Sequence, residues 1–488
     1  MKILDKKLFI SSGFDQVNLN WIIPVINDFM KFRKIDTIVF ESPLDLKKIN
    51  NNPKLKKILK DYKKIFFKKN FFMSIIFFFI NFFKILKFIN LIFSNKIILH
   101  KNWEDTQMLH SIWDSAKLNL LEKEYKASNF NLFYSIFRTF YKYSVFLNNQ
   151  KKYKFKTIFL SHSVYHYRAY MVAARKLNLE IFNSGFFNLH RQKKNYDISW
   201  WNVDKKNLNK ILRSINNTET NKYFENREKG KSNYTDATIS NFYFEKKFLY
   251  PENIIFLHIF KDSPFNMIDK KRIFNDYVDW IINTIKIINQ SDERWSFRLH
   301  PSCKEWGENQ KYIISKMINK YSRNKKNIFI DDNFVPIKHI FKYAKRCVTF
   351  SGTIHLESSA YGVKPIIISD AMLCKFDSNL FLKPKSINEY KYLLLEDSNS
   401  NVFKLTQEKR LFAKKLIFVR EKALLLKSEF DIDFIYRRDV KNIKKINKIL
   451  KKSNIKLKNN RKFVGQLALL LNNKFSHTLT KRFTRLFL

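Results

Sequence analysis

Short apolar runs alternate with stretches of helical periodicity along most of the chain. In the first half, apolar residues recur at helical spacing over 17–30, between two such runs, while 44–150 is mainly helical in pattern. Strands that alternate with helices are typical of βαβ units, so the pattern predicts a parallel sheet with a helical insertion. The strands predicted in this half are 7–11, 37–40, 156–161 and 180–182.

The same alternation returns more regularly in the second half, after a polar stretch from about 187 to 250 that predicts a loop-rich linker or insertion. The predicted strands here are 254–260, 295–299, 327–330, 347–350 and 364–369. The predicted helices between them are 271–288, 305–321, 336–344 and 354–361. Such a series favours a doubly wound parallel sheet. The fold class is therefore α/β, with two Rossmann-like doubly wound domains and a crevice between them.

The predicted division of the chain has three parts. An N-terminal domain occupies 1–245, with its helical insertion at about 44–150, and a C-terminal domain occupies 246–400. Residues 401–488 form C-terminal helices and a basic tail. A chain of 488 residues is too long for one ordinary hydrophobic core, which agrees with this division.

The charge of the chain favours anionic partners. There are 92 Lys and Arg against 43 Asp and Glu, a net charge of +49. Nucleic acid, a phosphate-bearing substrate and an acidic membrane surface all fit this balance. An AT-rich genome would explain the positive charge equally well, because such a genome favours residues such as Phe over Gly, and the chain has 50 Phe but only 7 Gly. The three cysteines, Cys303, Cys347 and Cys374, match no zinc-binding spacing and favour a reducing compartment.

Two segments bear on membrane contact. Residues 71–83 are uncharged and rich in Phe, and lysines flank them, which favours a helix lying on a membrane surface over a buried helix or a strained membrane span. The tail 437–488 carries 16 Lys and Arg against the single Asp439. Such a tail is attracted to anionic lipid, or else is a solvated terminus.

Polar residues follow four predicted strands of the second half, where open parallel sheets bind their ligands. They are Lys261 and Asp262, His300 and Pro301, Asp331 and Asp332, and the run from Ser351 to Glu357. The two adjacent aspartates could hold a metal, but side chains of neighbouring residues on an extended chain point to opposite sides. We therefore interpret Asp331 and Asp332 as a solvated turn.

The most specific of these signals is the turn Ser351-Gly352-Thr353, which leads from a strand into a helix. Its backbone N–H groups, hydroxyls and helix N-terminus suit a phosphate, and Gly352 leaves room for close approach. His355 and Glu357 follow on the first helical turn. The competing interpretation is a simple helix cap. No P-loop motif and no GxGxxG motif is present in the chain.

His300 is the second candidate for a phosphate contact. It ends a predicted strand, with Arg298 two residues before it and Pro301 after it. A histidine that donates to a leaving phosphate would neutralise charge as a glycosidic bond forms. The alternative is a histidine with structural hydrogen bonds only.

These residues carry a resemblance. Arg298-Leu-His300-Pro301, and the stretch from Val348 through Ser351-Gly-Thr353 to Gly362, resemble the nucleotide-sugar half of GT-B glycosyltransferases. The type is that of bacterial capsule and surface polysaccharide biosynthesis proteins (Kdo-transferase-like), with a more distant similarity to bacterial sialyltransferases. In the N-terminal half, Ser161-His162-Ser163-Val-Tyr165 is similar to an SH-x-x-Y element of the capsule proteins, and Trp103-Glu104-Asp105-Thr106 stands where they carry an acidic motif.

The resemblance implies a glycosyltransferase. A nucleotide-activated sugar, with a CMP-linked sugar as one candidate, would bind the C-terminal domain, and a growing surface or capsular polysaccharide or its lipid-linked acceptor would bind the N-terminal domain. The residues assigned to the nucleotide sugar are Lys261, Asp262, Arg298, His300, Pro301, Ser351, Gly352, Thr353, His355 and Glu357. Among them His300, Ser351 and Thr353 would meet phosphate, and Glu357 a ribose hydroxyl.

Transfer to an acceptor hydroxyl needs a general base. The acidic motif of the sialyltransferases is not matched cleanly, so Asp15 and Asp105 are the candidates, with His162 contacting acceptor or base. Glu41 also lies at a predicted strand end of this domain. We expect no metal and no cofactor besides the nucleotide-sugar co-substrate, because Lys261, Arg298 and His300 can supply the positive charge. The expected location is cytoplasmic, peripheral on the anionic inner face of the membrane.

Three other functions stay open from the sequence. A related GT-B enzyme without transferase activity, such as a nucleotide-sugar epimerase, would have the same fold. A basic nucleic-acid-binding protein would fit the charge, but the aromatic residues stand mostly in apolar runs rather than among arginines, and no RNA- or DNA-binding module is recognised. A purely structural role is the last alternative.

Overall fold

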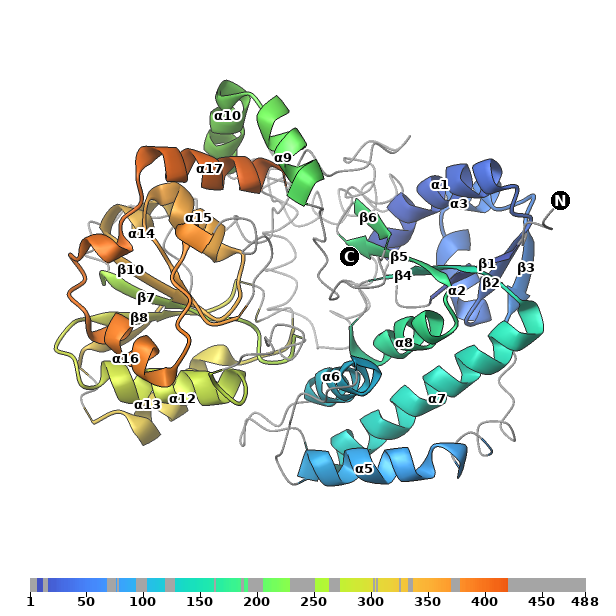
Figure 1. Cartoon of the computed structure of the whole chain (residues 1–488), viewed down its shortest axis with the longest axis horizontal. Coiled ribbons are helices and arrows are strands. Elements are labelled where there is room, and N and C mark those ends of the chain that lie inside the picture. The colour runs from blue at the N-terminus through green and yellow to red at the C-terminus, as the bar shows by residue number, and fades with distance from the viewer. Residues whose placement is uncertain are drawn as a thin grey trace, which may run out of the picture.

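The structure, a computed structural model, has two α/β domains side by side (Figure 1). It describes residues 7–11, 16–67, 76, 79–93, 103–118, 128–161, 164–185, 188–191, 205–228, 251–262, 273–301, 303, 306–323, 326–331, 337–369 and 378–419. The tail 437–488 and most of the Phe-rich segment 71–83 lie outside these residues. The two Rossmann-like domains expected from the sequence are confirmed.

The N-terminal sheet has six strands in the order β3-β2-β1-β4-β5-β6, all parallel except β6. They are β1 (Lys7–Ile10), β2 (Thr37–Phe40), β3 (Lys63–Phe66), β4 (Thr157–Leu160), β5 (Glu180–Gly185) and β6 (Asn188–Arg191). Strands β1, β2 and β4 are apolar and buried on both faces, as helix-covered parallel strands must be. Strand β3 was not predicted, because Lys63 and Lys64 give this edge strand a polar start inside a region that reads as helical.

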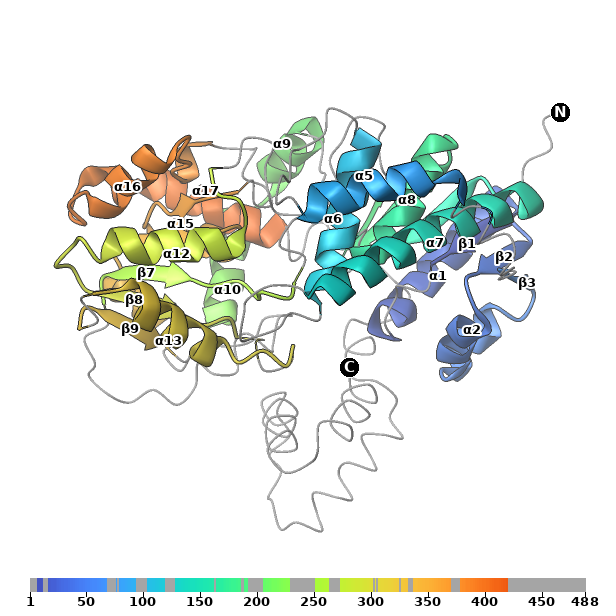
Figure 2. The same cartoon turned by 90° about the horizontal axis from the view of Figure 1, so that it is seen from below.

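Helices cover both faces of this sheet (Figure 1). One layer contains α1 (Gln16–Arg33), α2 (Pro43–Asn50) and α3 (Pro53–Ile58), and the other contains α5 (Phe82–Phe93), α6 (Trp103–Lys117), α7 (Asn129–Tyr153) and α8 (Arg168–Lys176). Alternate residues of β1 enter the two cores: Leu8 and Ile10 join one apolar cluster, and Phe9 joins the other. This alternation is the two-residue period of a strand. Figure 2 shows α5 outermost, lying across α6 and α7.

The C-terminal sheet has five parallel strands in the order β11-β10-β7-β8-β9. They are β7 (Asn253–Phe256), β8 (Trp295–Arg298), β9 (Ile328–Asp331), β10 (Arg346–Thr349) and β11 (Ile366–Ile367). The helices of this domain are α12 (Tyr277–Ile288), α13 (Gln310–Tyr321), α14 (Ile337–Tyr343), α15 (Ile354–Tyr361) and α16 (Ile387–Leu395). As in the other domain, the first strand is central and the strand order reverses beside it, which is where such sheets bind ligands.

A pair of helices occupies part of the stretch that the sequence predicted to be loop-rich. They are α9 (Lys205–Ser214) and α10 (Asn217–Glu228), and α10 packs against α17 (Gln407–Phe418). Leu208, Tyr223 and Phe224 share a buried cluster with Leu416 of α17. These few apolar residues lie in a very polar stretch of sequence, which is why the two helices were not predicted. The pair therefore lies with the C-terminal domain in space (Figure 1).

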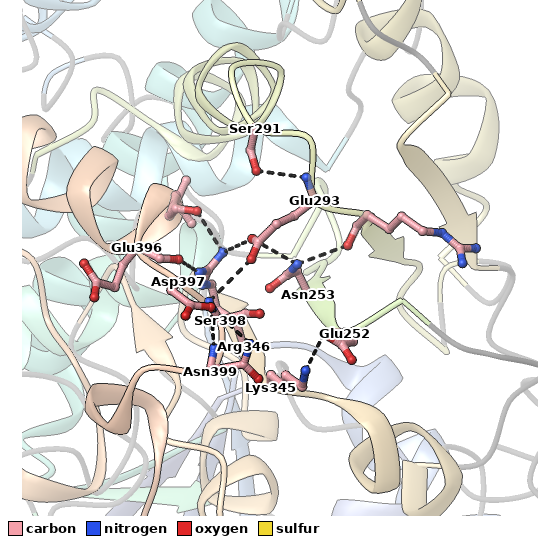
Figure 3. Close-up of polar contacts among 12 residues, drawn as sticks. Glu252, Asn253, Ser291, Glu293, Lys345, Arg346, Glu396, Asp397, Ser398 and Asn399 are labelled. Atoms are coloured by element: carbon pink, nitrogen blue, oxygen red, sulfur yellow. Dashed lines mark hydrogen bonds and ion pairs between the residues drawn. The ribbon is translucent and has the colours of Figure 1, made fainter.

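The amino end of the C-terminal sheet is closed by a polar network around Arg346, the first residue of β10 (Figure 3). The Arg346 guanidinium is fully buried and bonds the Glu293 carboxylate and the Leu394 carbonyl, both at 2.8 Å, and also the Glu396 carbonyl. The Asn253 amide donates to the same Glu293 carboxylate at 3.2 Å. Every one of these partners belongs to the C-terminal domain.

Candidate functional site

The opposite, carboxyl end of this sheet carries a second polar cluster, centred on His258. Strand β7 ends at Phe256, so His258 stands just beyond it. The His258 N–H donates to the Tyr277 hydroxyl at 2.5 Å, and the His258 carbonyl accepts from the Gln310 amide at 2.9 Å. Both backbone groups of His258 are thus fixed by side chains rather than by a neighbouring strand.

His300 lies next to His258, beyond the end of β8. Its N–H donates to the Gln310 side-chain oxygen at 2.7 Å, and its ring centroid is 5.8 Å from that of His258. Burial, together with the neighbouring His258, lowers the pKa of His300 to about 3. The imidazole of His300 is therefore neutral at physiological pH, able to donate one hydrogen bond and accept another.

The chain between these elements is held by Glu308. Its carboxylate accepts from the N–H groups of Phe260 at 3.1 Å and Lys261 at 3.2 Å, and from the Gln310 amide at 2.8 Å. Burial raises the pKa of Glu308. The Lys261 ammonium donates to the Gly307 carbonyl at 2.9 Å. The segment 258–262 is therefore fixed in place without any ligand, and Pro301 is exposed beside it.

The predicted anion turn lies on the other side of β7, after β10. Gly352 N–H bonds the Thr349 hydroxyl at 3.3 Å, and the His355 ring bonds the Gly352 carbonyl at 2.7 Å. Thr353 is the N-cap residue of α15, but its hydroxyl makes no capping bond. His355 is fully buried, so its ring supports the turn from within, whereas Glu357 on the first turn is half-buried. The simple-cap alternative is thus not what Thr353 does.

These two parts lie at the same edge of the sheet. Strand β7 pairs with β8 on one side and with β10 on the other. Adjacent strands are about 4.8 Å apart, so the chain ends that carry His300 and Ser351 are separated by roughly 10 Å, with His258 between them. The topology therefore brings the predicted phosphate residues to one edge of the sheet.

Arg298 and Asp331 correct one prediction. The Arg298 guanidinium forms an ion pair with the Asp331 carboxylate, whose side chain is 8% exposed. Asp331 was expected in a solvated turn, but it is the last residue of β9 and lies beside Arg298 in the register of the sheet. Asp332 lies outside the described residues. Arg298 has this structural partner at the predicted donor site.

Of the three candidate bases in the N-terminal domain, the structure describes only Asp105. Asp15 and His162 lie outside the described residues. Asp105 begins α6 and pairs with Lys84 of α5 at 3.0 Å and with Lys87 at 3.5 Å. Burial alone would raise the pKa of Asp105, but the hydrogen bonds and charges of the two lysines outweigh it and lower that pKa. These pairs attach α5 to α6, and a role for Asp105 as a base stays a prediction.

Glu41 directly follows β2, at the carboxyl end of the N-terminal sheet. Its carboxylate pairs with the buried Lys142 ammonium, which also donates to the Tyr170 hydroxyl at 3.1 Å. Burial lowers the pKa of Lys142, with Glu41 opposing that effect. This ion pair lies at the edge of the sheet where the acceptor was expected.

The two domains touch at the carboxyl end of the C-terminal sheet. The Tyr165 hydroxyl of the N-terminal domain donates to the Asp262 carboxylate at 3.0 Å. The Lys117 ammonium, at the end of α6, bonds the Asp276 carboxylate at 3.5 Å. One buried apolar cluster also contains residues of both domains. The candidate site therefore lies where the domains meet.

Sequence reasoning missed His258, Tyr277, Glu308 and Gln310. His258 was placed inside a strand over 254–260, whereas the strand ends earlier. A lone histidine near the end of an apolar run was the available signal. Glu308 and Gln310 lie far along the chain from Phe260 and His258, so no local pattern could have paired them.

Comparison with known proteins adds little beyond the fold. No protein-family model matches the chain. No curated protein matches it either. Among solved structures, UDP-GlcNAc 2-epimerase from Neisseria meningitidis bound to UDP-GlcNAc is 10% identical with a TM-score of 0.32, covering 85% of this chain and 98% of that one. The Methanocaldococcus jannaschii epimerase in complex with UDP-GlcNAc and UDP is 13% identical with a TM-score of 0.30, covering 84% and 99%.

A glycosyltransferase from Rickettsia africae is 10% identical with a TM-score of 0.27, covering 91% of this chain and 98% of that one. At such identities and TM-scores these likenesses assign no activity. The two-domain fold is established by the strand orders of the chain itself.

The described residues contain neither a cluster of metal-binding side chains nor a helix that could span a membrane. No group of three or more His, Cys, Asp or Glu side chains among them is arranged to hold a metal ion. In the same part of the chain, every helix is too short or too polar to cross a bilayer.

Proposed function

We propose that this protein is a glycosyltransferase that moves a sugar from a nucleotide-activated donor to a surface or capsular polysaccharide or its lipid-linked acceptor. The observation that carries the proposal is the pair of imidazoles, His258 and His300, at the carboxyl end of the C-terminal sheet and at the domain boundary. Ligands of open α/β sheets bind at this edge.

In this proposal His300 stabilises the leaving phosphate of the donor. A neutral imidazole can donate a hydrogen bond to an oxygen on which negative charge grows as the glycosidic bond to the donor breaks. Because Gln310 and Glu308 already fix the backbone, little reorganisation is needed when the donor arrives. Such preorganisation is the main source of electrostatic stabilisation in enzymes.

The turn after β10 would hold the rest of the donor. We assign the phosphate to Ser351, Gly352 and Thr353, and a ribose hydroxyl to Glu357. The N-terminus of α15 supports the assignment, as does the Thr353 hydroxyl, which makes no capping bond. The N–H groups of Gly352 and His355 already bond Thr349 and the Gly352 carbonyl. Lys261 would add positive charge near the phosphates, whereas the ion pair with Asp331 makes Arg298 a weaker candidate for that role. A CMP-linked sugar is the donor to test first.

The N-terminal domain would supply the general base, which takes the proton of the acceptor hydroxyl as that oxygen attacks the anomeric carbon. Asp15, Asp105 and His162 remain the assigned candidates. The ion pairs of Asp105 with Lys84 and Lys87 make it the weakest of the three.

We further propose that the enzyme works at the anionic inner face of the cytoplasmic membrane. The support is an apolar surface formed by Phe79 just before α5, by α5 itself and by the start of α7, where Phe79 is 67% exposed, Phe83 82% and Phe130 75%. Exposed apolar side chains of this size next to lysines such as Lys87 suit an interfacial helix. Sedimentation with vesicles tests this: binding to anionic but not to neutral vesicles is expected, and no binding to either removes the membrane from the proposal.

The decisive experiment for the activity is transfer by His300→Ala with a panel of CMP-, UDP- and GDP-sugars. Loss of a group that stabilises the transition state costs about a hundredfold or more in turnover. The expected result is that loss, with an unchanged unfolding transition. Unchanged turnover would remove the phosphate assignment of His300.

The epimerase alternative is separated by omitting the acceptor. An epimerase interconverts nucleotide sugars unaided, whereas a transferase leaves them intact apart from slow hydrolysis. Tight, salt-sensitive binding of oligonucleotides, with none of nucleotide sugars, would instead favour the nucleic-acid-binding function.

A further inference from the structure

The residue that joins the two domains stands in a strained turn. Tyr165 has φ 51°, in the left-handed region that residues other than glycine rarely adopt. It opens the short 3-10 turn Tyr165–Tyr167, and its carbonyl accepts from the buried Ser111 hydroxyl of α6 at 2.6 Å. Such backbone persists only where the surroundings determine it, and it clusters at functional sites. The strain is a reason to ask what Tyr165 does.

The Tyr165 side chain reaches the candidate donor site in the other domain. Its hydroxyl donates to one Asp262 carboxylate oxygen at 3.0 Å. The second oxygen of Asp262 is 4.0 Å from Nε2 of His258. His258 in turn faces His300, with ring centroids 5.8 Å apart. Neighbouring polar groups thus extend from Tyr165 of the N-terminal domain, through Asp262 and His258, to His300.

A second contact between the domains comes from α6, the helix whose Ser111 holds the Tyr165 turn. The Lys117 ammonium, almost fully buried, bonds one oxygen of Asp276 at 3.5 Å. The other Asp276 oxygen accepts from the Asp279 N–H at 2.8 Å and so caps α12. Ser111, which holds the Tyr165 turn, and Lys117 both belong to α6, which lies between the domains in both views (Figures 1 and 2). Asp262 and Asp276 both lie in the connection from β7 to α12, Asp262 nearer to β7 and Asp276 directly before α12. The two contacts from the N-terminal domain therefore meet the same connection.

An interface without a function would not need this arrangement. Apolar packing already joins the domains, and a charge-assisted bond at a strained residue adds little that packing could not provide. Its particular consequence is at Asp262. A carboxylate held beside a histidine can orient its ring. Here the holding group comes from the other domain, so the orientation of His258 depends on how the domains sit.

We propose that Tyr165 is a positioning residue that couples closure of the two domains to the donor-phosphate site, through Asp262 and His258. When the domains are together, the Tyr165 hydroxyl holds Asp262 against His258 beside His300, and Lys117 holds the start of α12. When they separate, Asp262 loses its partner and the donor site loosens. The identity of the ligand at His258 and His300 rests on the proposed function, whereas the coupling itself does not.

The test removes one hydroxyl. Tyr165→Phe deletes the bond to Asp262, and Tyr62→Phe is a matched control, because the Tyr62 hydroxyl makes a bond of similar length, 2.8 Å, to Asn27 within the N-terminal domain. Solution X-ray scattering reports the separation of the domains without ligand. Hydrogen exchange at the amides of Phe260 and Lys261 reports the order of the donor segment. Calorimetry with CMP and with UDP reports binding.

We expect Tyr165→Phe to scatter as a more open molecule, to exchange faster at these amides, and to bind the preferred nucleotide about tenfold more weakly, as for loss of a hydrogen bond to a charged group. Tyr62→Phe should match the wild type in all three. Lys117→Met should change scattering in the same direction as Tyr165→Phe.

The outcomes separate this inference from the proposed function. If Tyr165→Phe leaves scattering and exchange unchanged, or if Tyr62→Phe changes them equally, the coupling is overturned even when nucleotides bind. If the wild type binds neither nucleotide nor any nucleotide sugar, the proposed function fails, while scattering and exchange still decide the coupling. If the wild type binds nucleotide and Tyr165→Phe binds it equally well, the link to the donor site is wrong.

Discussion

Both ends of the C-terminal sheet carry a network of polar side chains, but the two networks have different roles. At the amino end, the buried Arg346 pairs with the partly exposed Glu293, and all the partners of this pair lie in the same domain (Figure 3). At the carboxyl end, His258 and His300 have their backbones fixed by Gln310, and the contact to the other domain begins at Asp262. The first network joins side chains and carbonyls of one domain, whereas the second fixes the backbone beside two imidazole rings that face one another.

The difference shows how a functional site can be distinguished from a structural ion-pair network in a chain with so many charged residues. A charged residue at a strand end is not by itself a site, because Arg346 stands at a strand end and is wholly structural. The distinguishing features of the carboxyl end are two imidazole rings side by side and a hydrogen bond that comes from the other domain. Perturbed titration in such a place is a sign of function, although ion-pair networks can also cause it.

The largest expected effect is at the amino end. Arg346→Ala removes the guanidinium from the carbonyls of Leu394 and Glu396 and from the Glu293 carboxylate, which keeps the weaker bond from Asn253. Removing one partner of a buried pair costs about 3–5 kcal/mol. We expect a loss of about 3 kcal/mol or more in chemical denaturation, with nucleotide binding unchanged wherever the fold persists.

The preceding residue is the control. Lys345 pairs with Glu252 at 2.8 Å, but both side chains are well exposed. Lys345→Ala should cost less than about 1 kcal/mol, as exposed pairs usually do. Equal losses for the two variants would contradict the view that the amino end is stabilised by the burial of Arg346.

Most of the fold could be predicted because each strand is short and apolar. The runs at 37–40 and 295–299 coincide with β2 and β8 almost residue for residue. Prediction failed where the local text is polar. Strand β3 begins with two lysines and pairs only at an edge, and α9 and α10 are ordered by a few apolar residues that meet α17 about 190 residues later in the chain.

The candidate site was predictable in outline only. His300 and the Ser351 turn follow strands, so topology alone brings them to one edge. Their supports could not be foreseen, because Glu308 bonds Phe260 and Tyr165 bonds Asp262 across long separations in sequence. Arg298 looked like a ligand for phosphate, and only the register of β8 with β9 shows that it pairs with Asp331.

A second variant asks whether the carboxyl end is preorganised. Glu308→Gln keeps the shape but replaces one of the two carboxylate oxygens, which accept from the N–H groups of Phe260 and Lys261, with an NH2 donor. An unsatisfied buried polar group costs about 1–3 kcal/mol. We expect a loss in the lower part of that range, together with weaker nucleotide binding by calorimetry. Glu293→Gln at the amino end is the counterpart, and if it weakens nucleotide binding as much, the two ends are not functionally distinct.

A pH series sharpens the comparison further. The pKa of His300 falls from its usual value of 6.5 to about 3 in the folded protein, through burial and the proximity of His258. The unfolded chain therefore binds a proton that the folded chain refuses between about pH 6.5 and 3, and stability falls as the pH is lowered through this window. The slope is at most roughly 1.4 kcal/mol per pH unit for one proton.

His300→Gln should flatten this acid loss, measured as the difference in unfolding free energy between pH 7 and 5. Arg346→Lys at the other end should shift the whole curve without flattening it. A wild-type curve and a His300→Gln curve that run parallel would show that the ring is protonated as readily in the folded protein as in the unfolded chain.

The smallest expected effect on stability is at Gly352, and it gives the sharpest contrast with binding. A Cβ added there would lie 3.1 Å from the Thr349 hydroxyl and 3.4 Å from a methyl of Ile354, contacts that small shifts relieve. We expect Gly352→Ala to change stability by less than about 1 kcal/mol, because reduced freedom of the unfolded chain offsets part of the crowding.

Gly362, at the other end of α15, is the control. It has φ 98° and its Cβ would lie 3.1 Å from Arg410, so Gly362→Ala should cost more stability. If the turn receives the donor phosphate, Gly352→Ala loses nucleotide affinity although it barely alters the fold, whereas Gly362→Ala loses stability and keeps affinity. The reverse result would make the Ser351 turn a structural helix start and leave the histidines as the whole of the site.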